Sequence, residues 1–535
     1  MSILSLPLEI LTCICEHLEP QEWGALRITC HQIYANTLEA YATRYFKSLS
    51  LLLTRDSLDH LEEVAASEAL RDLVEEISII PNLFEGWPQR DKENFKSLED
   101  PTSTNAEAEL DALFAAYECT LAEHRAILDS KLHGVLEKCL PRLKNVTTIA
   151  LRSYPLEYLL LKANYRSFRC LGLRELKKFN SADVLGHLTF ASFRKDMLST
   201  PFGLAISQVF QAIIKSNRKI RSLHTCGNYA CGINLGSLEL PESMYRLLLP
   251  LLSDLMALHM CIRIKDHEQD KFVEETFKRL LNILVTVAPK LKILEFAQWN
   301  PWEELSPLYF EDLSGKIRFS QLEELHLHSI EVTVDTLRQF LQTAAPTLKR
   351  LSMDMISLTD AIIAARDPGP ITEERSSWGS SFSIEVMNEI TTLWMRGFQF
   401  LADDLELQFV QLSKLGYRGR EIKLQDDLYM ERGQPNAQPD SCAQPSIDPH
   451  DIYSDPTGGQ LIAFYFDAEK ASIPLKQWIM QLQMEMCNPL SRAPCRLPGT
   501  SGKSFNREGM RSLIMYPPGP VPVEDPGRRS AILEF

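Results

Sequence analysis

The sequence predicts an α/β protein in which a short helical module precedes an irregular array of strand–helix units. Residues 5–18 contain a serine and a proline at their start and carry apolar residues on two sides of one helix. Farther along, short Leu-x-x-Leu-x-Leu segments recur and alternate with amphipathic helical patterns. A single strand–helix unit cannot bury its apolar face alone, so we expect such units to stack on one another.

Composition narrows the class of protein. The chain has 535 residues, 45% of them hydrophobic and 24% charged, which is typical of globular proteins. Its net charge of -15 argues against sequence-independent binding of nucleic acid, because that binding depends on Lys and Arg neutralising phosphates. No stretch approaches the roughly 18 apolar residues of a membrane span, and no basic segment precedes the first apolar residues. We therefore expect no membrane, no signal peptide and no nucleic-acid partner.

The 12 cysteines are scattered, and none forms a C-x-x-C pair. This usage is typical of reduced thiols buried as small apolar side chains in a protein of a reducing compartment. The sequence therefore predicts an intracellular protein of the cytoplasm, the nucleus or both.

The first 46 residues predict three short helices. Ser5 suits an N-cap, Pro7 suits a first helical turn, and Pro20 restarts the chain before a pattern that runs to Phe46. The first helix has two apolar stripes, one with Leu8, Leu11, Cys15 and Leu18 and one with Ile10, Ile14 and the stem of His17. About ten large apolar residues are too few for a core that stands alone, so the module needs something to pack against.

These residues resemble an F-box. The matching pattern is Leu6-Pro7-x-Glu9-Ile10-Leu11-x-x-Ile14, then Leu18, then Trp23-x-x-Leu26-Arg27-x-Thr29-Cys30. Trp23 stands where the family usually has Leu, His31 where it has a basic residue, and Ile33 where an aromatic residue is common. None of these departures exchanges an apolar residue for a charged one.

The resemblance implies that the module docks on the Skp-family adaptor, which links it to a cullin scaffold with a RING subunit. The second apolar stripe would then belong to a partner. The alternative is a helical cap that covers the end of the following domain. The residues that the resemblance assigns to the adaptor are Leu6, Pro7, Ile10, Leu11, Ile14, Leu18, Trp23, Leu26 and Cys30.

Residues 47–142 are expected to form a helical linker region. An amphipathic pattern covers residues 54–80, and a second helical stretch covers residues 106–140. Between them, the polar, proline-containing segment 86–105 predicts a disordered loop.

Residues 143–432 are expected to form the array. The clearest copies of the strand pattern are LKILEF (291–296), LEELHL (322–327) and LKRLSM (348–353), and weaker ones lie at 143–151, 185–190, 220–225, 255–260 and 405–412. Corresponding apolar residues fall at 149, 188, 223, 258, 294, 325 and 351. The pattern resembles degenerate leucine-rich repeats, although most intervals exceed the usual length of about 20–29 residues. The alternative is an ordinary α/β domain with leucine-rich strands.

Two further segments interrupt or follow this pattern. Residues 365–382 are expected to form a loop inserted before the last repeat. Residues 433–535 are expected to be mostly disordered and rich in proline, with a short ordered segment at 461–486 that contains one strand and one helix.

Side chains alternate along a strand, so residues between the leucines point away from the core and together form an outer face. The candidate target-binding residues on it are Arg152, His224, His259, Glu295, His326, His328, Arg350 and Asp354. The histidines raise the question of a metal site or a pH switch. We expect His224 and His259 to be neighbours and His326 to lie two strands farther on, with no trio of ligands for a tetrahedral metal. A polar protein-binding face is the favoured interpretation.

No motif predicts a catalytic residue or a cofactor. GTSGKS (499–504) has Leu497 where a phosphate-binding loop requires glycine, and no strand or helix pattern frames it. The favoured function is the non-catalytic, substrate-recognition subunit of a Skp–cullin–F-box ubiquitin ligase. One alternative is a leucine-rich-repeat scaffold that binds the adaptor without acting in ubiquitination, and another is an enzyme with an unrecognised site.

Overall fold

The structure is a computed structural model, and the part of the chain that it describes belongs to one compact unit, Met1–Trp378 with Phe382–Cys487. The described residues are 3, 6–18, 20–81, 106–152, 170–172, 199–225, 233–234, 238, 240–263, 270–298, 308–359, 384–413, 415–417, 420–421, 423–426, 463–469 and 474–485. The expected loops at 86–105 and 365–382, the strand copy at 185–190, the segment 433–460 and GTSGKS lie outside these residues.

Three helices form the N-terminal module, as predicted: α1 (Leu8–His17), α2 (Pro20–Arg27) and α3 (His31–Phe46). Pro7 precedes α1, where its missing N–H is tolerated, and Glu9 lies in the first turn, where a negative charge is favourable. The thiol of Cys30 caps α3 by accepting a hydrogen bond from the Ile33 backbone N–H at 3.5 Å.

The module has a small apolar core of its own. Leu11, Cys15, Trp23 and Tyr45 are buried together, and Tyr41 packs against them. The Trp23 ring meets Tyr41 and Tyr45 edge-on, at centroid distances of 5.5 and 5.7 Å. Such edge-to-face pairs favour one arrangement of the rings, so aromatic packing sets how α2 sits on α3.

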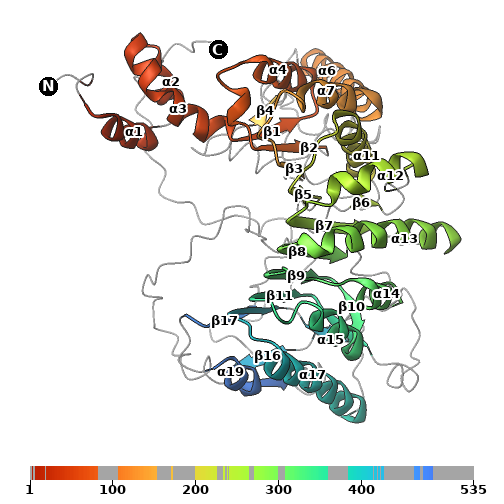
Figure 1. Cartoon of the computed structure of the whole chain (residues 1–535). Coiled ribbons are helices and arrows are strands. Elements are labelled where there is room, and N and C mark those ends of the chain that lie inside the picture. The colour runs from red at the N-terminus through yellow and green to blue at the C-terminus, as the bar shows by residue number, and fades with distance from the viewer. Residues whose placement is uncertain are drawn as a thin grey trace. The chain divides into compact units, whose positions relative to one another are not determined.

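A 12-stranded sheet follows, in the order β17-β13-β11-β9-β8-β7-β5-β3-β2-β1-β4, with β6 beside β7 (Figure 1). Every pairing in it is parallel except that of β17 with β13. The strands are β1 (Ser48–Leu52), β2 (Glu76–Ile80), β3 (Thr148–Leu151), β4 (Cys170–Leu171), β5 (Ser222–His224), β6 (Ile233–Asn234), β7 (Ala257–Arg263), β8 (Ile293–Gln298), β9 (Glu324–His328), β11 (Arg350–Asp354), β13 (Phe409–Ser413) and β17 (Ala463–Asp467).

Helices connect most of these parallel strands, as crossover connections require. They are α4 (Arg55–Ala66), α6 (Ala106–Ala126), a π-helical turn (Ile127–Lys131), α7 (Leu132–Cys139), α11 (Ser199–Ser216), α12 (Glu242–Leu252), α13 (Asp270–Val287), α14 (Leu308–Lys316), α15 (Val334–Gln342) and α17 (Ile384–Asp404). In Figure 1, α11, α12 and α13 lie side by side along the sheet, and each packs on the next.

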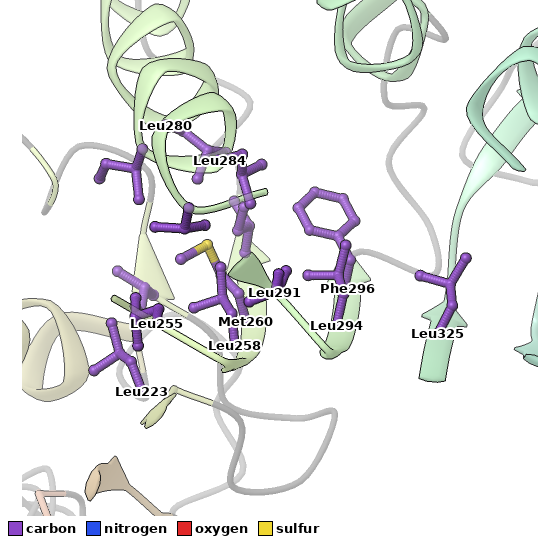
Figure 2. Close-up of a cluster of buried hydrophobic side chains, with 14 of the residues drawn as sticks. Leu223, Leu255, Leu258, Met260, Leu280, Leu284, Leu291, Leu294, Phe296 and Leu325 are labelled. Carbon is purple, nitrogen blue, oxygen red and sulfur yellow. The ribbon is translucent and has the colours of Figure 1, made fainter. Parts of the chain in front are cut away.

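The core lies between these helices and one face of the sheet. Leucines in matching register positions of five strands are nearly inaccessible: Leu223, Leu258, Leu294, Leu325 and Leu351. Figure 2 shows Leu280 and Leu284 of α13 on the same side as Leu258. The leucines predicted to point inward therefore do so, and they pack the strands of the sheet against the helices.

The sheet begins earlier than predicted. Residues 48–52 and 76–80 form β1 and β2, although the amphipathic pattern over 54–80 predicted a helix to residue 80. The helix α4 ends at Ala66, and the next apolar residues pair with β1 and β3. Ser50 and Ser78, on the opposite faces of these strands, are buried as well, so the alternation that marks a strand is weak here.

Two small sheets complete the described part of the unit. The strands β10 (Glu331–Thr333), β12 (Ser357–Thr359), β14 (Gly416–Tyr417) and β15 (Arg420–Glu421) form one, and β16 (Lys423–Asp426) pairs with β18 (Leu482–Glu485) in the other. The strand predicted within 461–486 is β17, and the predicted helix is α19 (Leu475–Gln481), which packs on α17. The predicted helix ends earlier than expected, because Leu482–Glu485 pairs as a strand. By pairing with β13, β17 covers a sheet edge that would otherwise expose unpaired backbone groups.

Candidate functional site

Helix α1 exposes one of its two apolar sides. Leu8 is 50% exposed and Ile10 is 49% exposed, whereas Leu11 is 2% exposed and Cys15 is completely buried. Ile14 lies between these extremes. The module therefore covers Leu11 and Cys15 of the first stripe and leaves Ile10 of the second stripe open to water. Leu8, where the first stripe begins, is exposed as well, so apolar area is available for a partner at the start of α1.

The nine residues assigned to the adaptor fall into three groups. Pro7 and Ile10 are exposed, and Leu11 and Trp23 lie in the core of the module. The half-buried members are Leu6, Ile14, Leu18, Leu26 and Cys30. The positions of Leu11 and Trp23 differ from the expectation that they contact the adaptor directly. Trp23 turns inward because Tyr41 and Tyr45 of α3 form an aromatic pocket for its ring.

A buried arginine stabilises the same module and was not among the predicted residues. The Arg27 guanidinium lies over the rings of Tyr41 and Tyr34, at 4.0 and 4.4 Å from their centroids. Such cation–π contacts contribute about 0.5–2 kcal/mol each, depending on desolvation. The sequence signal for this contact is a Tyr pair seven residues apart on one helix face, at positions 34 and 41.

The second group of candidates forms a polar row across the other face of the main sheet. His224, His259, Glu295 and His326 occupy one register position in the consecutive strands β5, β7, β8 and β9. The rings of His224 and His259 stack at 4.1 Å, and His259 Nδ1 lies 2.7 Å from a Glu295 carboxylate oxygen. The prediction that His224 and His259 are neighbours is confirmed, as is the position of His326 two strands beyond His259.

The row continues through ion pairs at its far end. His328 Nδ1 lies 2.6 Å from a carboxylate oxygen of Asp354, and His326 Nε2 lies 3.0 Å from Glu324. The Arg350 guanidinium lies 3.4 Å from the same Glu324. Glu324 was not among the predicted candidates, although it precedes a core leucine and so points to this face.

Electrostatics keep Glu295 ionised. Burial alone would raise the pKa of its carboxyl group, but the hydrogen bond from His259 and the nearby charges of His259, His326 and His328 lower it below the usual value. For Glu324, the hydrogen bond from His326 and the charge of Arg350 lower the pKa. At neutral pH both carboxylates are therefore negative, and the histidines surround them.

Arg152 lies at the end of β3 and pairs with Glu76 of β2 at 3.0 Å. Seven of the eight candidates for the target-binding face therefore lie on β5 to β11, and Arg152 lies one strand beyond them. Within the described residues, no group of three or more His, Cys, Asp or Glu side chains is arranged to hold a metal ion. Of the helices that the structure describes, none has the length and apolar character needed to cross a membrane.

Comparison with known proteins identifies the N-terminal module. Residues 3–35 match the family model of the F-box domain, which covers α1, α2 and the first residues of α3. No curated protein matches the chain. The match agrees with the pattern of Leu, Pro, Ile and Trp residues on which the resemblance was based.

Proposed function

We propose, from the premise that this chain carries an F-box domain at residues 3–35, that it is the substrate-recognition subunit of a Skp–cullin–F-box ubiquitin ligase. F-box domains bind Skp-type adaptors and, through them, the cullin scaffold. The observation that carries the proposal is the exposure of two large apolar side chains in the first turn of α1, Leu8 and Ile10, next to the exposed Pro7. The proposal includes the expectation that the protein acts in the cytoplasm, the nucleus or both.

The adaptor contact would bury the exposed half of each apolar side chain on α1. Fully burying a Leu or Ile side chain is worth about 1.5–3 kcal/mol, so the half-exposed Leu8 and Ile10 would each contribute roughly 1 kcal/mol or slightly more. Pro7, Leu6, Ile14, Leu18, Leu26 and Cys30 complete the proposed contact set. Leu11 and Trp23 would act indirectly, by keeping α1 and α2 in place.

Target recognition would use the polar row on the main sheet. We infer that the strand–helix units are degenerate leucine-rich repeats, because parallel strands with buried leucines recur in register across the sheet. His259, Glu295 and His326 then lie on the face of the sheet opposite the buried leucines. Repeat proteins bind their partners on such a face.

The proposed mechanism is proximity. In this mechanism the chain would supply no reacting group of its own. It would hold a target protein near the ubiquitin-conjugating enzyme that the cullin carries, so that a target lysine reacts at a high effective concentration. The affinity of the chain for the adaptor and for the target, and the relative position of the two when bound, would then set the rate of ubiquitin transfer.

A scaffold that binds the adaptor without the cullin is the second candidate, because the open side of α1 requires only the adaptor. Purification of tagged chain with the proteasome blocked separates the two. The receptor predicts that adaptor and cullin are recovered together, and that the half-life of a captured protein lengthens when residues 1–46 are deleted. Recovery of the adaptor alone, with no half-life changed, would favour the scaffold.

Substitution on α1 tests the adaptor contact itself. Ile10→Asp places a charge on the open apolar side, and Leu247→Asp does the same at a residue of α12 that is 58% exposed. We expect Ile10→Asp to abolish recovery of adaptor and cullin and Leu247→Asp to leave it unchanged. Equal recovery of adaptor and cullin with the unchanged chain, with Ile10→Asp and with Leu247→Asp would rule out the proposal.

A further inference from the structure

The edge at which the main strands begin carries a regular row of residues. Backbone hydrogen bonds link them from strand to strand: Met256 N–H to Arg221 O, Lys292 N–H to Met256 O, Glu323 N–H to Lys292 O and Lys349 N–H to Glu323 O, at 2.7 to 2.9 Å. Uncharged residues continue the row at both ends, Thr147 before β3 and Gln408 before β13. Beyond Thr147 the row continues through Glu75 and Lys47, which pair with each other at 3.3 Å and so add no net charge. The part with an excess of cations spans the starts of β5, β7, β8, β9 and β11 (Figure 1).

Two carboxylates on this edge are each held by two lysines. Asp254 pairs with Lys219, at 2.7 Å, and with Lys290. Glu323 pairs with Lys292 and Lys349, each at 3.4 Å. In each triad one negative charge is shared by two positive charges, so one positive charge remains.

Arg221 adds a third positive charge. It is exposed, lies at the β5 end of the row two residues after Lys219, and has no ion-pair partner among the residues that the structure describes. We call these seven residues the basic edge: Lys219, Arg221, Asp254, Lys290, Lys292, Glu323 and Lys349. They combine five cations with two carboxylates, in a chain whose net charge is -15. Positive charge is therefore concentrated at the basic edge, although the chain as a whole is acidic.

The two carboxylates stay ionised over the physiological range. Hydrogen bonds from Lys219 and Lys290 lower the pKa of Asp254 to about 2, and hydrogen bonds and charge from Lys349 and Lys292 lower the pKa of Glu323. They hold the lysine side chains in place along the edge. All five basic groups remain at least partly exposed and reachable by a ligand.

The cations of the row have a defined spacing. Arg221, Lys292 and Lys349 lead into β5, β8 and β11, which are alternate strands of the sheet. Adjacent strands lie about 4.8 Å apart, so these cations recur about every 9.6 Å along the edge. In the polyproline II conformation a chain makes one turn every three residues and rises about 9.3 Å, so every third side chain lies on the same face. Carboxylates at every third residue of such a segment would therefore meet each cation in turn.

We propose that the basic edge binds an acidic polypeptide segment in the polyproline II conformation, whose Asp or Glu residues recur at every third position. A peptide fits better than a nucleic acid, because duplex DNA carries one charge per about 1.7 Å, whereas these cations recur only about every 9.6 Å. The basic edge is separate from the polar row proposed for the target, and the inference holds whether or not the chain acts in a ligase.

The test measures binding of fluorescent peptides to the purified full-length chain by anisotropy. The probe has glutamates at every third position among neutral residues, and the control peptide has the same composition with its glutamates in one block. We expect the periodic peptide to bind more tightly and its affinity to fall as salt is raised, because ions screen exposed charges. Equal binding of the two peptides would overturn the proposed spacing.

A matched pair of variants assigns the binding to this edge. The variant Arg221→Gln/Lys349→Gln leaves both lysines on Asp254 and one lysine on Glu323. The variant Lys138→Gln/Lys215→Gln neutralises two exposed lysines of α7 and α11 that also make ion pairs. We expect the first to weaken binding by about threefold to tenfold and the second to change it little. Equal losses in both variants, or tighter binding of a single-stranded polynucleotide of the same charge, would contradict the inference.

Discussion

Replacement of Trp23 separates the packing of the F-box module from its contact with a partner. The indole is completely buried between Tyr41 and Tyr45, and its Nε1–H has no hydrogen-bond partner in the described part of the chain. Removing a buried Trp side chain typically costs about 3–5 kcal/mol. The core of the module has only four buried members, so Trp23→Ala should leave residues 8–46 largely unfolded.

Trp23→Phe should behave differently. Phenylalanine keeps an aromatic ring against Tyr41 and Tyr45, and it removes a buried N–H that has no partner, which offsets part of the packing that is lost. We expect a net cost within about 1 kcal/mol. If Trp23 supports the adaptor contact only by packing, this variant keeps its affinity for the adaptor.

Hydrogen exchange measures the outcome segment by segment. The cluster around Trp23 is distinct from the core of the sheet, so Trp23→Ala should raise amide exchange in residues 8–46 while β1 and β2 stay protected. Trp23→Phe should leave both segments near wild type. The reasoning is refuted if Phe is as damaging as Ala, or if the exchange of β2 rises as much as that of α1.

Three further predictions concern the sheet. Leu258→Ala should lower the free energy of unfolding by about 2–5 kcal/mol in urea titrations, because Leu258 is fully buried beneath α13; a loss below about 1 kcal/mol would contradict its place in the core. Gly172→Ala should destabilise the unit by about 1–3 kcal/mol, since Gly172 has φ +86° and a Cβ there would lie 2.7 Å from Thr54 Oγ1; unchanged thermal unfolding would argue against this backbone conformation. The folded-state pKa of Glu295 lies below its usual value, so its stabilisation is complete above the usual pKa and is lost as pH falls through the lower folded value. Glu295→Gln should therefore cost roughly 1–2 kcal/mol at neutral pH and progressively less on acidification, and a cost independent of pH would refute the ion pair with His259.

The sequence predicts the leucine strands well because each places alternate residues in one core. Leu258, Leu294 and Leu325 are buried, and the residues between them, such as His259 and Glu295, face the other side. The strands β1 and β2 were missed because Ser50 and Ser78 are buried opposite leucines and isoleucines. Strands that are covered on both faces lack the alternation of apolar and polar residues from which a strand is predicted in a single sequence.

The candidate sites show the same division. Spacing along the chain was sufficient to predict that His224 and His259 are neighbours, because parallel strands align equivalent positions. It was not sufficient to decide which stripe of α1 the module covers. Leu11 and Ile10 are adjacent and equally apolar, and only the packing of Trp23 and Tyr45 places Leu11 inside and Ile10 outside.

The central claim is that the open side of α1 is a docking surface for the Skp-type adaptor. Calorimetric titration of the purified adaptor into the purified chain tests it most directly, with Ile10→Ala compared with Leu247→Ala. We expect Ile10→Ala to raise the dissociation constant by about fivefold to tenfold, because it should lose roughly 1 kcal/mol or slightly more of binding free energy. Leu247→Ala should leave the dissociation constant unchanged. Wild-type affinity in the Ile10→Ala protein would contradict the account.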